Sequence, residues 1–287
     1  MADIEKLVDG FVCDLNCPRN CCLESIGGCF TEGDYELVKQ LNGKIMRDGS
    51  IIRLRESLES CEEGMRFPQD SKGICMFFRD NCCMLQASFG REALPYDCRD
   101  YPRNILCFMG HTDKMLDPVC PHAAELIIKS DTLFWSYMTR MVEPDPEGLF
   151  AERREMILTL QNEKLTLPEA LNRICGSYGR GQGCVCDRLF PSDIDAALRH
   201  FFACMLFGNL FYYGYDKELF ESQAEHDTIV SARMYDFLSQ TDDLNLDNLS
   251  DYFGKAYYNC YEKTTINKRY DLLQENVTIH RRDSENK

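Results

Sequence analysis

Residues 11–22 read FVCDLNCPRNCC, and this stretch places four cysteines on one short segment of the chain. A thiolate is a soft, anionic ligand suited to zinc, copper(I) or iron–sulfur clusters. Thiolates that are close in sequence bind one metal at a small cost in loop entropy. Further cysteines in the first 121 residues continue the pattern. It predicts a metal centre, and the candidate ligands are Cys13, Cys17, Cys21, Cys22, Cys75, Cys83, Cys98 and Cys120.

The spacing of these cysteines leaves the type of metal open. Cys13, Cys17 and Cys21 stand four residues apart, so their thiolates can hold three irons of a four-iron cluster and leave the fourth iron open. The candidate thiols also suffice for two four-ligand sites, or for one cluster and a smaller centre. A closed zinc site of four thiolates would use some of the same residues and would be purely structural. We expect an iron–sulfur cluster of the 4Fe-4S type, with zinc as the alternative metal.

The other cysteines are predicted to lie outside the metal centre. Cys204 falls within a hydrophobic segment and is expected to be a small core residue. Cys184 and Cys186 are separated by one residue, so their thiols are close enough to bind a ligand together or to exchange. A disulfide framework is not expected, because the total of 17 cysteines is odd and the vicinal pairs, such as Cys82-Cys83, suit a metal better.

The overall composition excludes several classes of protein. A hydrophobic share of 44% with 28% charged residues is typical of a soluble globular protein. The formal net charge of −15 repels phosphate backbones, which argues against a general nucleic-acid binder. No apolar run reaches the ~18 residues of a membrane span, and the first residues lack the basic start and apolar stretch of a secretory signal. We therefore expect a cytoplasmic protein without nucleic-acid or membrane partners, a compartment in which structural disulfides are rare.

Hydrophobic periodicity divides the chain into two predicted parts. Residues 1–130 are rich in Cys, Gly and Pro and show only short periodic segments, so metal binding is expected to supply folding energy that packing lacks. The predicted fold class is mainly α with a few short strands, in which this cysteine-rich metal-binding domain is followed by a helical domain over residues 131–287. Helices are expected over residues 34–41, 168–175, 193–213, 223–238 and 246–261 and from Pro121 and Pro146 onward, and short strands at 51–52 and 74–78.

Several short motifs around the cysteines resemble the flagellin lysine-N-methylase family. The same cysteine skeleton is similar to a wider group of zinc- or iron-chelating cysteine-rich domain proteins. The resemblance extends over about 110 residues and depends on the motifs taken together. In chain order they are FVC at 11–13 with Cys17 and Cys21-Cys22, CMFF at 75–78, CMLQ at 83–86, GREALP at 90–95, CRDYPR at 98–103 and Cys120-Pro121.

The resemblance implies an iron–sulfur enzyme that methylates the ε-amine of surface lysines on a flagellin-like protein substrate. S-adenosylmethionine is the methyl source expected from the family, whose cysteines match the candidate ligands. Arg99 and Arg103 are candidate cofactor-binding residues, because a guanidinium can hold a cofactor carboxylate or compensate the negative charge of a thiolate-ligated cluster. A structural ion pair is the alternative role for each arginine. The sequence assigns no catalytic base.

Two other functions use the same cysteines. The first is a non-catalytic iron–sulfur or zinc-binding protein, such as an electron-transfer module. The second is a zinc-stabilised interaction protein whose helical half binds a partner. A Rossmann-type site for the methyl donor is not expected, since the glycines of residues 176–183 follow a predicted helix rather than a strand.

Overall fold

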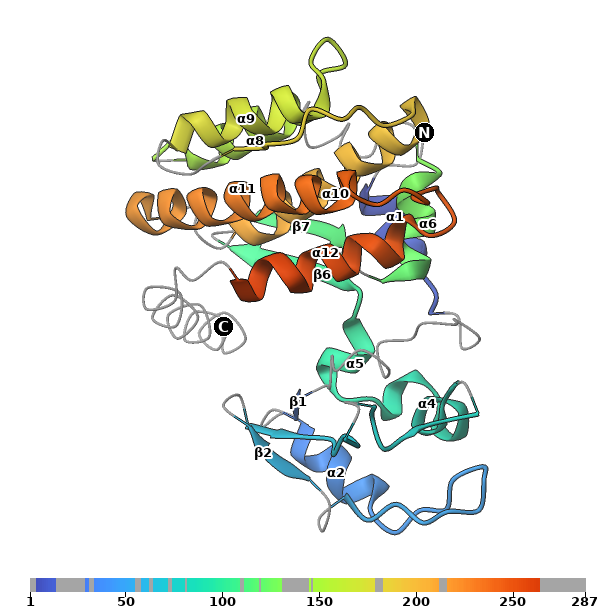
Figure 1. Cartoon of the computed structure of the whole chain (residues 1–287). Coiled ribbons are helices and arrows are strands. Elements are labelled where there is room, and N and C mark those ends of the chain that lie inside the picture. The colour runs from blue at the N-terminus through green and yellow to red at the C-terminus, as the bar shows by residue number, and fades with distance from the viewer. Residues whose placement is uncertain are drawn as a thin grey trace. The chain divides into compact units, whose positions relative to one another are not determined.

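The structure is a computed structural model that describes most of the chain. The described residues are 4–13, 29–30, 34–54, 58–61, 64–71, 74–80, 82–108, 111–118, 120–130, 145, 147–178, 183–211 and 216–263. Figure 1 shows the course of the whole chain.

The chain forms two compact units. The cysteine-rich unit comprises Val12–Pro102 and Cys120–His122. The helical unit comprises Met1–Phe11, Arg103–Val119 and Ala123–Lys287. These units differ from the predicted ranges 1–130 and 131–287, because the N-terminal helix and a β-hairpin from the first half of the chain belong to the helical unit.

The helical unit contains long helices and one antiparallel hairpin. In the hairpin, β6 (Arg103–Phe108) pairs with β7 (His111–Leu116), with Arg103 opposite Leu116. Helix α11 contacts α9, α10 and α12, and α10 also contacts α8 and both strands of the hairpin (Figure 1). The helices are α1 (Ile4–Gly10), α6 (Pro121–Ile128, which belongs to this unit from Ala123 onward), α8 (Leu149–Leu160), α9 (Leu167–Tyr178), α10 (Ser192–Phe211), α11 (Lys217–Ser239) and α12 (Leu249–Lys263).

Helix α10 supplies much of the core of this unit. Its side chains from Leu198 to Phe207 are almost all buried, as expected of a helix that is hydrophobic on every side. The rings of Phe201 and Phe202 meet the ring of Phe253 on α12 edge to face, at centroid distances of 4.9 and 5.5 Å. These aromatic contacts bury large apolar areas and fix α12 against α10.

A buried ion pair joins the hairpin to two helices. Asp113 of β7 accepts a hydrogen bond of 2.6 Å from Nη2 of Arg153 on α8. Nη1 of the same arginine donates to the carbonyl of Phe207 on α10, at 2.8 Å. The guanidinium lies 4.4 Å from the centre of the Phe207 ring, and the side chains of both charged residues are almost fully excluded from solvent. Removing either charge would leave the other uncompensated in the core.

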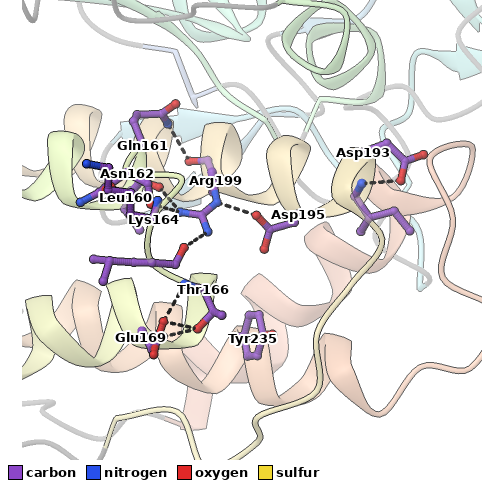
Figure 2. A network of polar contacts seen from close by, with 12 residues as sticks. Leu160, Gln161, Asn162, Lys164, Thr166, Glu169, Asp193, Asp195, Arg199 and Tyr235 are labelled. Carbon is purple, nitrogen blue, oxygen red and sulfur yellow. Dashed lines mark hydrogen bonds and ion pairs between the residues drawn. The ribbon is translucent and has the colours of Figure 1, made fainter.

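Arg199 of α10 fixes the turn between α8 and α9 (Figure 2). Its Nη1 donates to the carbonyl of Leu160, its Nη2 to that of Leu165, both at 2.6 Å, and its Nε to Asp195 at 2.5 Å. A cation at the last carbonyls of a helix satisfies unpaired acceptors and the helix dipole together. This one side chain therefore ends α8 and holds the following turn to α10.

The cysteine-rich unit consists of small sheets and short helices. A three-stranded antiparallel sheet has the order β1-β3-β2, and β4 pairs with β5 in a second sheet. Isolated bridges join Ile45 to Ile51 and Gln69 to Cys75. The elements are β1 (Cys29–Phe30), α2 (Tyr35–Leu41), β2 (Glu59–Cys61), β3 (Gly64–Arg66), β4 (Phe78–Arg79), β5 (Cys82–Cys83), α4 (Met84–Phe89), the 3-10 helix η2 (Arg91–Ala93) and α5 (Tyr96–Asp100).

The structure confirms a mainly helical fold with a few short strands. The predicted helices at 34–41, 168–175, 223–238 and 246–261 correspond to α2, α9, α11 and α12, and α6 begins at Pro121 as predicted. The predicted helix 193–213 is α10, which begins at Ser192. The short strands expected at 51–52 and 74–78 are not formed as predicted: Ile51 and Cys75 each make one isolated bridge, and β4 begins only at Phe78. None of the helices in the described ranges is long and apolar enough to cross a membrane.

Candidate metal centre

The five candidate ligands that the structure describes belong to the cysteine-rich unit. Cys13, Cys75, Cys83 and Cys98 lie within Val12–Pro102, and Cys120 belongs to the separate segment Cys120–His122. Cys17, Cys21 and Cys22 fall in the same range of the chain but lie outside the described residues. The sequence alone does not predict that Cys120 belongs to this unit, because the residues before it, Arg103–Val119, belong to the helical unit.

Three of the candidate thiols border one hydrophobic cluster. Cys75 is 8% exposed and is part of this cluster, while Cys83 and Cys98 pack against it. The cluster also contains Phe77 and Leu85, both almost fully buried. Apolar packing therefore brings together cysteines that are up to 23 positions apart in the sequence, since Cys75 and Cys98 share one core.

Short hydrogen-bonded elements set the backbone around these cysteines. The backbone bridge between Gln69 and Cys75 fixes one of them. The ladder between β4 and β5 pairs Phe78 with Cys83, and Cys83 also stands immediately before the first residue of α4. Cys98 lies within α5, whose first residue, Tyr96, donates its backbone N–H to Asp34 at 3.2 Å. Backbone hydrogen bonds thus fix the positions of Cys75, Cys83 and Cys98.

The described residues do not by themselves complete a metal site. Within the described ranges, no group of three or more His, Cys, Asp or Glu side chains is arranged to hold a metal ion. Cys13 is exposed and Cys120 is partly buried. The metal centre stays a prediction, and so does its type.

Arg99 is partly exposed and surrounded by charged groups of its own unit. Its side chain lies 3.9 Å from a carboxylate oxygen of Glu92 and 3.9 Å from one of Asp100. Its guanidinium also lies 5.7 Å from the centre of the Tyr96 ring. Ion pairs as long and as exposed as these contribute little to stability, so this guanidinium can turn toward an anionic ligand at small cost.

Arg103 is held differently and belongs to the helical unit. Its Nε donates to the carbonyl of Val8 at 3.2 Å, and its Nη2 donates to the carbonyl of Phe11. The guanidinium lies 5.0 Å from the centre of the Phe11 ring. These contacts place Arg103 at the end of α1, where a cation satisfies carbonyls that have no partner within the helix. These contacts are structural, as in the alternative role predicted for Arg103, but the partners are backbone carbonyls rather than a carboxylate.

The helical unit contains a buried polar cluster that the sequence did not predict. Asp227 of α11 accepts a hydrogen bond from Nε2 of Gln223 at 2.8 Å and lies 3.1 Å from Nδ1 of His226. The Oδ2 atom of Asp227 and the Oε1 atom of Gln223 are buried without a hydrogen-bond partner. Spacing of i and i+4 on one helix explains the pairing of Gln223 with Asp227, but only tertiary packing buries it.

Comparisons with protein-family models, with curated proteins and with solved structures found no match.

Proposed function

We propose that the chain is a lysine N-methylase-like enzyme that carries a cysteine-ligated iron–sulfur cluster in its cysteine-rich unit. Its substrates would be S-adenosylmethionine and the lysine side chains of a flagellin-like protein. The observation that supports this proposal most is that the five candidate thiols within the described residues belong to one compact unit, including Cys120 after the excursion of the chain through Arg103–Val119. The choice of methyl transfer depends on the resemblance of the cysteine motifs to the lysine-N-methylase family.

The donor set suits the proposed cluster. Thiolates are the ligands that iron–sulfur clusters prefer in proteins, and Cys75, Cys83 and Cys98 border a common apolar cluster in which solvent is largely excluded. When bound, a cluster with one open iron would supply a Lewis-acidic position that can chelate the amino-acid end of the methyl donor. Arg99 would add a positive charge beside the thiolates.

Residues of the protein must help the substrate lysine to lose its proton before methyl transfer. An ammonium group cannot attack a methyl group until it has lost its proton, and transfer into a dry cleft lowers the pKa of lysine toward that state. A carboxylate near the cleft would then accept the proton. Asp100, which follows Arg99 on α5 and pairs with Arg91 at 3.6 Å, is available in the same unit for this role.

The test uses full-length protein purified without oxygen. The purified chain would be incubated with flagellin and S-adenosylmethionine that carries a deuterated methyl group, and tryptic peptides of flagellin would be searched by mass spectrometry for labelled lysine. The proposal expects labelled methyl-lysine with the wild-type chain, and none with Cys98→Ser. Cys260→Ser is the matched control, because Cys260 lies in α12 of the helical unit and should leave the activity unchanged.

Each possible result has a defined meaning. Iron and sulfide in the purified chain without methyl transfer to any lysine would refute the enzyme and favour a non-catalytic iron–sulfur protein. Zinc alone, with no visible absorption from iron, would refute the cluster and favour a structural zinc site.

A further inference from the structure

A second group of thiols lies in the helical unit, away from the candidate metal ligands along the chain. Cys184 and Cys186 lie in the segment between α9 and α10, of which the structure describes residues 183–191. Cys175 lies in α9 and is buried, whereas Cys184 and Cys186 are partly buried. All three are free thiols.

Hydrogen bonds to α9 and to α11 fix the segment. The backbone N–H of Cys184 donates to Oδ1 of Asn172 on α9, at 2.6 Å. Gly183 makes this close approach possible, because a Cβ atom at this position would lie 2.0 Å from the same oxygen. Further along, Nη1 of Arg188 donates to the carbonyl of Ser239 at 2.6 Å. The two cysteines therefore lie on a segment whose path is set by its neighbours.

Asp236 of α11 fixes the backbone between the two cysteines. The N–H groups of Val185 and Cys186 both donate to Oδ1 of Asp236 on α11, at 3.0 and 2.8 Å. Successive N–H groups point in opposite directions along an extended strand, whereas two that converge on one carboxylate form a concave nest. Even in an extended chain the Cα atoms of residues i and i+2 lie only about 6.4–6.8 Å apart, with both side chains on the same face, which is within the separation of about 4.4–6.8 Å that a disulfide spans.

The surroundings disfavour the ionised form of Cys184. Burial raises the pKa of its thiol above the ordinary range, and the nearby charge of Asp236 and the thiols of Cys175 and Cys186 raise it further. The Sγ atom of Cys175 donates to the carbonyl of Thr228 at 3.3 Å. Thiol–disulfide exchange begins with a thiolate, so Cys184 is disfavoured as the thiol that attacks first.

We propose that Cys184 and Cys186 form a thiol–disulfide exchange site that a low-molecular-weight disulfide closes into an intramolecular disulfide. The thiolate of Cys186 attacks one sulfur of the small disulfide, forms a mixed disulfide and releases one small thiol. The thiolate of Cys184 then attacks the Sγ atom of Cys186 and releases the second small thiol. Two protein thiols are oxidised, one small disulfide is reduced to two thiols, and the two protons pass to these thiols. The proposal is independent of the metal centre and of methyl transfer.

The sequence provides a direct readout by peptide mapping. Trypsin cleaves after arginine, so the fragment 181–188, GQGCVCDR, contains Cys184 and Cys186 and no other cysteine. The fragment 174–180, ICGSYGR, contains Cys175. Full-length reduced protein would be incubated with oxidised glutathione, quenched with acid, alkylated with iodoacetamide and digested. We expect fragment 181–188 to lose alkylation at both cysteines and to be two hydrogens lighter than its reduced form.

Three other outcomes would overturn the proposal. They are complete alkylation of fragment 181–188 at every glutathione concentration, a stable double glutathione adduct, and a cross-link between fragments 174–180 and 181–188. Cys175→Ala is the matched control, because disulfide formation at Cys184 and Cys186 should proceed at an unchanged rate in this variant.

A second variant tests the order of the two steps. With Cys184→Ser, the reaction should stop at a mixed disulfide between glutathione and Cys186, since no thiol is left to displace the glutathione. With Cys186→Ser, a glutathione adduct on Cys184 should form at least tenfold more slowly. Equal rates of adduct formation in the two variants would contradict the assignment of Cys186 as the attacking thiol.

Discussion

Replacement of Arg153 by methionine should destabilise the helical unit strongly. Methionine fills a similar volume but removes the partner of Asp113 and the donor to the carbonyl of Phe207. Breaking a buried ion pair by removing one partner costs about 3–5 kcal/mol, because a charge stays behind in the core without compensation. The lower bound corresponds to a factor of roughly one hundred in the local unfolding equilibrium.

Hydrogen exchange measured by mass spectrometry can locate this loss of stability. Amides in β7 and α8 should exchange roughly one hundred times faster in Arg153→Met than in the wild type, at low and at high salt alike, since a buried pair is screened little. The double variant Arg153→Met/Asp113→Leu removes both charges and should recover most of the lost protection. If the double variant were no more stable than the single one, the penalty would not arise from the stranded carboxylate, and the reasoning would be wrong.

Two further predictions concern other contacts of the helical unit. Gly208→Ala should lower the free energy of unfolding in urea by about 1–3 kcal/mol, because the new Cβ would lie 2.1 Å from Sδ of the buried Met115. The control Gly176→Ala in α9 places its Cβ in open space and should leave the stability unchanged or raise it. Burial raises the pKa of the Cys204 thiol well above its ordinary value, so its contribution to stability is complete below the unfolded pKa and is lost as the pH rises above it. Between pH 8 and pH 10 the wild type should therefore lose about 2 kcal/mol more stability than Cys204→Ala, and an equal loss in both proteins would contradict this.

Local sequence signals were sufficient to predict most of the helices. Apolar residues at helical spacing and the proline at the start of α6 identify these elements without any tertiary contact. The helix expected from Pro146 onward begins at Leu149, and the carboxylate of Asp145 accepts hydrogen bonds from the backbone of Phe150 and Ala151 in its first turn. Such signals act over one or two turns of helix, and residues close in sequence carry them.

Long-range features were not predictable in the same way. The hairpin of β6 and β7 belongs to the helical unit because α1 and α10 cover it, and no local pattern in residues 103–116 reveals those partners. The pairing of Asp113 with Arg153 joins residues 40 positions apart, and it depends on how three elements meet. The sequence shows which residues are charged, but it does not show which of them form a buried ion pair.

The candidate metal site also combines features that the sequence predicts with features that it does not. The sequence identifies thiols as the reactive groups and their spacing as suitable for a metal, because these depend on residue type and on short loops. The packing of Cys75 and Cys98 against one apolar cluster, and the grouping of Cys120 with them in one unit, come from the tertiary structure alone. The same holds for Cys184 and Cys186, because the hydrogen bond from the backbone of Cys186 to Asp236 of α11 joins residues 50 positions apart.

The metal content of the protein tests the central claim most directly. Protein purified without oxygen should contain about four irons and four sulfides per cluster, and it should show visible absorption. Cys21→Ala should lose this metal together with solubility, since metal binding contributes folding energy, and Cys260→Ala should keep both. Wild-type protein that contains neither iron nor zinc, or equal metal content in the two variants, would contradict the account.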